Sequence, residues 1–415
     1  MNAQNLSSPD TIALFQDYVI PNYGRYGINL VRGEGSSIWD AEGNRYLDLF
    51  PGWGCNLLGH CPPKVVQAIQ KQVARLVHVP NSWHFESQGQ WAKLLSDRSF
   101  GGQAFFCNSG AEATDGALKL AYKYHGGKRA TVLHAHNSFH GKLLGAGSVT
   151  GSPSAWFDYP KLPNTDSFTY ADIDSVREAL ARHRGPGGQS DVYALILEPM
   201  SASTYTRCNG VFLRELRDLC TRDDIVLIFD EVYTGWCRTG AWFYFMHHGV
   251  VPDVVTMSKA FGGGKASISA YVARAPILEK AYGRVRDVTL HTTTYNGFGE
   301  ECATAVEAIS VMVDEDFVGK GRHIAERMET LIEEGPYGDG PAGSLARASQ
   351  EPERPTESPN QTRFATLTGE VVLDHAACLE CEAKPCLTSC VPQILTEQDG
   401  VPVLNIDEAD AARGG

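Results

Sequence analysis

Two short strand-like runs that each lead into a charged residue constrain this chain more than any other feature. Residues 225–229 (IVLIF) are followed by Asp230, and residues 253–257 (DVVTM) are followed by Ser258 and Lys259. Runs of this length, bounded by turn residues and separated by helical patterns, predict buried strands of a parallel sheet. Because ligands bind beyond the carboxyl ends of the strands in such sheets, we expect Asp230 and Lys259 to face one crevice.

An acid and a lysine that face one crevice suit one cofactor chemistry. A lysine amine forms a Schiff base with an aldehyde cofactor, and an acid that holds a proton on a pyridine nitrogen makes that ring an electron sink. Three glycines at 262–264 add a flexible turn beside the lysine. The pair predicts a site for pyridoxal phosphate (PLP). Taken singly, Asp230 could simply cap a helix and Lys259 could be a solvated loop residue, but the pair favours the cofactor.

Length, charge and cysteine content limit the class of protein. The chain has 415 residues, enough for two or three domains, and a net charge of -13, which argues against nucleic acid or an anionic membrane as partner. The first ten residues show no secretion signal, and no apolar run reaches the length of a membrane span. Seven of the eleven cysteines are scattered, as free thiols are in a reduced compartment, so we expect a cytoplasmic protein.

A candidate phosphate site follows a short apolar strand in residues 105–112 (FFCNSGAE). Ser109 and Gly110 stand where the strand ends and a helical pattern opens. Free N–H groups and the dipole at a helix N-terminus bind phosphate, and the glycine lets the backbone approach closely. A Ser-Gly pair at this position is more often only a helix cap, so the signal is weak by itself.

Residues 134–142 contain three histidines and one aromatic residue. His134, His136 and His140 could suggest a metal site, but no carboxylate or thiolate stands nearby in the sequence to complete it. We favour instead an aromatic residue, Phe139, stacked on a cofactor ring, with Gly141 giving access. The alternative is that Phe139 belongs to the core.

The order of elements predicts the fold class. A buried run at 192–197 (VYALIL) ends at Glu198, and a helical pattern at 211–220 leads to the strand before Asp230. Strand and helix patterns alternate from residue 103 to 275, which indicates an α/β domain with a mainly parallel sheet.

The motifs together resemble the class III aminotransferases, the acetylornithine, ornithine and 4-aminobutyrate group of fold-type I PLP enzymes. The resemblance covers residues 15–334 and rests on many pieces in a shared order. The pieces are VRGEGSSIWDAEGNRYLDL, LGHCPPKVVQAIQKQ, FFCNSGAEATDGALKLA, NSFHGK, ILEP, IFDEVYTG, RTG, PDVVTMSKAFGGG and HTTTYNG.

The resemblance implies a role for each matching residue. Lys259 forms the Schiff base and shuttles the proton, Asp230 pairs with the ring nitrogen, and Glu198 lies near the ring and the substrate. Thr294 reaches the phosphate of the other subunit, which implies a homodimer. The implied cofactor-binding set is Ser109, Gly110, Ala111, Phe139, His140, Asp230, Val232, Lys259 and Thr294, with Val232 and Phe139 on opposite faces of the ring.

Three departures leave the amino donor open. The family usually continues ILEP with Gln-Gly-Glu-Gly, whereas residues 200–203 are MSAS. Tyr233 stands at the position of a family glutamine, and Lys142 stands at the position of an arginine that often binds a substrate carboxylate. Lysine is a point charge and cannot form the two parallel hydrogen bonds of arginine.

The last part of the chain departs further. Residues 335–363 are rich in proline and glycine and predict a flexible linker. Cys378, Cys381, Cys386 and Cys390 follow, in a segment that resembles half of a bacterial-type ferredoxin with altered spacing. We favour a 4Fe–4S cluster over zinc there, with unligated thiols as a further alternative.

The predicted organisation has five parts. These are an N-terminal segment of a small domain (1–60), a PLP-binding large domain (61–298), interdomain helices (299–334), the linker (335–363) and a ferredoxin-like fragment (364–415).

The expected function is PLP-dependent transfer of an amino group from an ω-amino donor to a 2-oxo acid such as 2-oxoglutarate. Family members continue with a C-terminal domain that helps enclose the substrate, and no segment after Glu334 matches it. We therefore expect cofactor binding with weak overall transfer. The alternative is an iron–sulfur electron-transfer or scaffold protein whose PLP-binding part is not catalytic.

Overall fold

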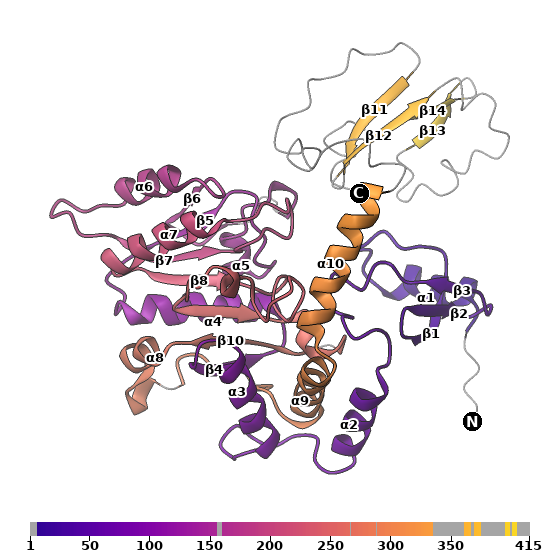
Figure 1. Ribbon diagram of the computed structural model, residues 1–415, viewed down its shortest axis with the longest axis horizontal. Coiled ribbons are helices and arrows are strands. Elements are labelled where there is room, and N and C mark those ends of the chain that lie inside the picture. The colour runs from indigo at the N-terminus through magenta and orange to yellow at the C-terminus, as the bar shows by residue number, and fades with distance from the viewer. Residues whose placement is uncertain are drawn as a thin grey trace. The chain divides into compact units, whose positions relative to one another are not determined.

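The computed structural model describes most of the chain up to residue 334 and four strands beyond it (Figure 1). The described residues are 6–155, 160–265, 267–287, 289–334, 361–366, 369–374, 395–398 and 401–404. They divide into two compact units. The larger unit comprises Gly33–Ser37 and Leu47–Glu329, and the smaller takes its described residues from Met1–Arg32, Ile38–Tyr46 and Thr330–Gly415.

A seven-stranded sheet forms the centre of the larger unit, in the order β4-β10-β9-β8-β7-β5-β6. All neighbours from β9 to β6 pair in parallel, and β10 alone runs antiparallel to both of its neighbours. The predicted mainly parallel sheet is therefore confirmed. The strands are β4 (Gln103–Cys107), β5 (Thr131–Ala135), β6 (Thr165–Phe168), β7 (Val192–Leu197), β8 (Val226–Asp230), β9 (Val254–Met257) and β10 (Ser269–Ala273).

The inner strands form because apolar residues occupy both of their faces. Every residue of β7 and β8 is buried. Successive side chains point to opposite faces of a strand, so Leu195 and Leu197 join one hydrophobic cluster, whereas Ala194 and Ile196 join a second. This double burial is typical of parallel sheets covered by helices on both faces.

Helices cover both faces of the sheet (Figure 1). Helices α4 and α8 contribute to the smaller cluster, and α3, α6, α7 and α9 contribute to the larger one. The helices are α2 (Pro63–Val73), α3 (Glu86–Arg98), α4 (Gly110–Tyr124), α5 (Leu144–Ser148), α6 (Ile173–Arg182), α7 (Gly210–Arg222), α8 (Ala275–Tyr282), α9 (Gly299–Asp314) and α10 (Phe317–Glu334). None of the helices within the described ranges combines the length and the apolar character that a membrane crossing requires.

Short elements stand near both ends of the chain. Helix α1 (Ser8–Tyr18) precedes a three-stranded sheet of β1 (Leu30–Glu34), β2 (Ser37–Asp40) and β3 (Arg45–Leu47). Near the C-terminus, β11 (Gln361–Thr366) pairs antiparallel with β12 (Gly369–Asp374), and β13 (Leu395–Gln398) pairs antiparallel with β14 (Val401–Leu404). The four cysteines of the predicted cluster site, Cys378 to Cys390, lie outside the described residues.

Candidate active site

Lys259 lies just past the carboxyl end of β9, as the sequence predicts. It begins a short 3-10 helix, Lys259–Gly262, and adopts a φ of 57°. A non-glycine residue at positive φ is strained, and such strain is commonly retained at functional sites. Burial lowers the pKa of the Lys259 amine, Asp230 opposes this change, and Arg238 adds to it. The amine is therefore brought closer to the neutral form that attacks an aldehyde.

Asp230 ends β8, the strand beside β9, and is 4% exposed. Asp230 pairs with Thr256 of β9. Thr256 in turn lies three residues before Lys259. Both residues thus reach the same edge of the sheet. One carboxylate oxygen accepts the backbone N–H of Val232 at 3.0 Å.

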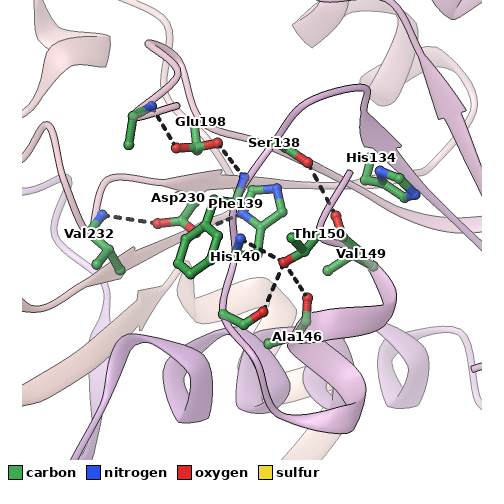
Figure 2. A network of polar contacts seen from close by, with 12 residues as sticks. His134, Ser138, Phe139, His140, Ala146, Val149, Thr150, Glu198, Asp230 and Val232 are labelled. Atoms are coloured by element: carbon green, nitrogen blue, oxygen red, sulfur yellow. Dashed lines mark hydrogen bonds and ion pairs between the residues drawn. The ribbon is translucent and has the colours of Figure 1, made fainter. Parts of the chain in front are cut away.

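His140 is the second partner of Asp230 (Figure 2). Its Nδ1 lies 2.7 Å from the other carboxylate oxygen, and both side chains are buried. Because a carboxylate only accepts hydrogen bonds, we assign the proton of this bond to Nδ1. The other ring nitrogen, Nε2, is buried without a partner among the described residues. His140 therefore fixes the orientation of Asp230.

Thr150 anchors the loop that carries Phe139 and His140 (Figure 2). Its hydroxyl oxygen accepts the N–H of His140 at 3.0 Å and lies 2.9 Å and 3.0 Å from the carbonyl oxygens of Gly141 and Ala146. Thr150 is 1% exposed, so water does not compete for these bonds. The hydroxyl thus holds the His140 backbone in place.

Glu198 fixes the same loop from β7. One of its oxygens accepts the N–H of Phe139 at 2.8 Å and the hydroxyl of Tyr170 at 3.1 Å, and the other accepts the N–H of Ala202 at 2.9 Å. Burial raises the pKa of Glu198, whereas His140 and the two backbone N–H groups oppose the rise. Its contacts make Glu198 a residue that positions the loop.

The N-terminus of α4 lies against the end of β8. Ser109 is the N-cap of this helix, with its Oγ accepting the N–H of Glu112 at 3.3 Å, while the Glu112 carboxylate accepts the N–H of Asn108 at 3.1 Å. A β-carbon on Gly110 would meet the Val232 side chain at 3.0 Å, a tight contact to which Val232 would have to yield, so glycine favours this close approach of the helix end.

The loop after Phe139 lies against the same end of α4. Gly141 has a φ of 126°, and a β-carbon there would approach the Ala111 side chain within 2.5 Å. The predicted phosphate residues, both residues predicted to face the ring, and Asp230 therefore belong to one neighbourhood.

The other sequence candidates are exposed or form their contacts with residues outside this set. Thr294 is exposed on a loop, where its carbonyl accepts a hydrogen bond from Asn81 at 3.4 Å, and Lys142 is exposed. His134 contacts the carbonyl of Ala135 and His136 contacts Ser167. Within the described ranges, no group of three or more histidine, cysteine, aspartate or glutamate side chains is placed to hold a metal ion.

Two residues of the site escaped the sequence analysis. Thr150 and Tyr170 belong to segments with no recognised motif, and each acts through a single hydroxyl, Thr150 on His140 ten positions earlier and Tyr170 on Glu198 28 positions later. No local pattern marks such residues. His140 was included among the cofactor-binding residues, but its bond to Asp230, 90 positions away in the sequence, became visible only in the structure.

The arrangement fits PLP. Lys259 supplies a desolvated amine. Asp230, oriented by His140, supplies a buried carboxylate for the ring nitrogen, and the unpartnered Nε2 of His140 marks a polar site that the described residues leave unfilled. The N–H groups at the start of α4 offer the usual site for a phosphate, and Gly110 lets that helix end lie close to Val232.

Comparison with known sequences gives a consistent result. The family described as Aminotransferase class-III matches residues 18–335. The acetylornithine aminotransferase of Caldanaerobacter subterraneus subsp. tengcongensis is 38% identical over 324 residues, which cover 76% of this chain and 79% of that protein. The acetylornithine aminotransferase of Methanocaldococcus jannaschii is 36% identical over 339 residues, covering 79% and 81%.

Solved structures agree with the sequence comparison. The ornithine aminotransferase of Toxoplasma gondii, described with PLP at partial occupancy in its active site, has a TM-score of 0.73 and 27% identity, covering 82% of this chain and 78% of that chain. The acetylornithine aminotransferase of Elizabethkingia anophelis has a TM-score of 0.66 and 28% identity, covering 80% and 81%. The comparisons lend no support to the alternative of an electron-transfer or scaffold protein.

Proposed function

The chain belongs to the class-III aminotransferase family and is a PLP-dependent aminotransferase, and from this we propose that it moves an amino group from an ω-amino donor to a 2-oxo acid. The observation that carries the assignment of residues is the placement of Lys259 and Asp230 at one edge of the sheet, with Asp230 held by His140. The proposed donors resemble acetylornithine, ornithine or 4-aminobutyrate, and the proposed acceptor is 2-oxoglutarate. The curated relatives named above support this donor class.

In this proposal each residue has a defined task. Bound PLP supplies an aldehyde and an electron-accepting ring. Lys259 would hold the aldehyde of PLP through its amine, and that amine, once the substrate amine has displaced it, would be placed to move a proton at the substrate. Asp230 would hold a proton on the ring nitrogen, and His140 would keep the Asp230 carboxylate oriented through its 2.7 Å contact. Ser109, Gly110 and Ala111 bind the phosphate.

The positioning of the ring follows from its neighbours. Val232 and Phe139 face the ring from opposite sides in this proposal. Glu198 holds the Phe139 backbone through a 2.8 Å hydrogen bond, so it acts on the ring through Phe139. Such fixed geometry matters because small displacements of reacting groups reduce rates strongly.

A coupled assay tests the function. We expect N-acetylornithine, ornithine or 4-aminobutyrate to convert 2-oxoglutarate to glutamate, and we expect Lys259→Ala to abolish turnover. Borohydride reduction followed by peptide mapping should place the pyridoxyl group on Lys259. A label on another lysine would refute the assignment of Lys259, and PLP-loaded protein that transfers an amino group from none of the donors would refute the donor class.

Three further properties are part of the proposal. A homodimer would let Thr294 of each subunit reach the phosphate site of its partner, and its exposure supports this. A cytoplasmic location is supported by the seven free cysteines in the described part of the chain. A 4Fe–4S cluster, or alternatively zinc, at Cys378, Cys381, Cys386 and Cys390 is supported by their spacing in the sequence alone. Light scattering and metal analysis of the purified protein test the first and the last of these properties.

A further inference from the structure

Lys259 and a second cation, Arg238, both contact the ring of Tyr233. The Nζ of Lys259 is 5.0 Å from the centre of this ring, and the guanidinium carbon of Arg238 is 5.3 Å from it. Arg238 also contributes to lowering the pKa of Lys259. Lys259 and Arg238 both oppose the rise that burial causes in the pKa of the Cys55 thiol. Arg238 therefore stands beside the reacting amine.

Arg238 carries a charge that no described carboxylate balances. Its one hydrogen bond within the described ranges runs from Nη2 to the carbonyl oxygen of Gly54, at 2.5 Å. Its Nε is buried and has no partner there. Burial lowers the pKa of the guanidinium, with Tyr233 and Cys55 opposing the change. The Arg238 side chain is half-buried, and a charge that is partly removed from water without a partner is costly, so such an arginine is expected to meet an anion in the working protein.

The guanidinium is held in a fixed place before any anion arrives. Tyr233 lies against it, and a β-carbon on Gly54 would come within 2.9 Å of its Nη2. Gly54 also has a φ of 88°, which other residues rarely adopt. Burial and a hydrogen bond with Tyr205 raise the pKa of the Tyr233 hydroxyl, so Tyr233 stays neutral and adds no competing negative charge.

We propose that Arg238 is a specificity-determining residue that binds a carboxylate of the amino donor and of the 2-oxo acid, with Tyr233 and Gly54 positioning its guanidinium. This inference rests on the proposed function, in which every substrate brings a carboxylate to the site of Lys259. The planar guanidinium can bind a carboxylate through two parallel hydrogen bonds, which a lysine cannot do. The anion would also offset the repulsion between Arg238 and Lys259.

The test compares donors with and without a carboxylate. The half-reaction of the PLP-loaded protein is followed by the absorbance of the bound cofactor, with 4-aminobutyrate and with butylamine as donors. We expect Arg238→Gln to weaken the apparent affinity for 4-aminobutyrate about 10- to 100-fold, the range of a lost charge-assisted hydrogen bond. The apparent affinity for butylamine should stay within about twofold. Arg238→Lys should fall between the parent and Arg238→Gln, since lysine keeps the charge only.

Arg98→Gln is the matched control. Arg98 also packs on an aromatic ring, 5.0 Å from the centre of Trp242, and also has a buried Nε without a described partner. It lines a separate cavity whose lining includes neither Lys259 nor Tyr233. Loss of a stacked arginine that merely supports the fold should change the apparent affinities for both donors alike. Arg98→Gln should therefore leave the ratio of the apparent affinities for 4-aminobutyrate and butylamine unchanged.

Binding of glutarate gives a readout that needs no turnover. Glutarate carries carboxylates but no amino group, and calorimetric titration should show weaker binding to Arg238→Gln than to the parent. An unchanged glutarate affinity, no glutarate binding to the parent, or equal losses for both donors would overturn the role of Arg238. These outcomes leave the proposed function standing if amino transfer persists, whereas absence of transfer from all amino donors contradicts the proposed function itself.

Discussion

The hydroxyl of Thr150 offers a sharp test of how the active-site loop is held. Thr150→Val keeps the volume of the side chain and removes only the hydrogen-bonding group. In the folded protein this hydroxyl accepts the His140 N–H at 3.0 Å and lies within hydrogen-bond distance of the carbonyl oxygens of Gly141 and Ala146. Because Thr150 is 1% exposed, no water can replace the lost partner without rearrangement.

The expected cost follows from those contacts. A buried N–H left without an acceptor costs about 1–3 kcal/mol, and the bond donated by the hydroxyl contributes roughly 1 kcal/mol more. We therefore expect Thr150→Val to lower the free energy of unfolding by about 2–4 kcal/mol. Thr150→Ser keeps the hydroxyl and loses one buried methyl group, which costs about 0.5–1.5 kcal/mol by analogy with other methyl deletions.

Urea unfolding of the PLP-free protein measures this loss of stability. Since the loop carries His140, which orients Asp230, Thr150→Val should also weaken PLP binding more than Thr150→Ser does, and absorbance titration with PLP measures this effect. A Thr150→Val variant that is as stable as Thr150→Ser would refute the reasoning, because filling of space would then matter more than the hydroxyl.

Three other changes test separate parts of the site. Asp230→Asn should still allow borohydride to fix PLP on Lys259, but it should slow turnover by at least about 100-fold, because a neutral amide does not hold the ring proton. Borohydride mapping and steady-state rates measure these two effects, and a turnover equal to that of the parent would contradict the role of Asp230. Gly141→Ala should destabilise the protein by about 1–3 kcal/mol, because its φ of 126° is unfavourable with a β-carbon and Ala111 lies in the way; unchanged unfolding would show that the loop adapts. Burial lowers the pKa of His134 from its ordinary value of 6.5 to about 4, so the stability that His134 contributes is present above pH 6.5 and is lost as the pH falls through about 4. His134→Gln should flatten this part of the thermal-stability profile, and an unchanged slope would assign the acid sensitivity to other groups.

The sequence alone predicted the central strands and the positions of Asp230 and Lys259 at the carboxyl ends of two of them. The run at 192–197 coincides with β7, and the runs at 225–229 and 253–257 overlap β8 and β9. Strands buried on both faces consist of unbroken apolar residues, so the local pattern reports them directly. The polar residue at the end of each run then lies at the carboxyl edge of the sheet, which is how Asp230 and Lys259 were found.

Tertiary structure alone determined the partners of these residues. The bond between His140 and Asp230 joins positions 90 apart, and the bond between Arg238 and Gly54 joins positions 184 apart. The antiparallel direction of β10 likewise follows from its place in the sheet between β4 and β9. The physical reason is that local sequence encodes burial and turn chemistry, whereas a hydrogen bond between distant side chains exists only after the order of the strands has brought their ends together.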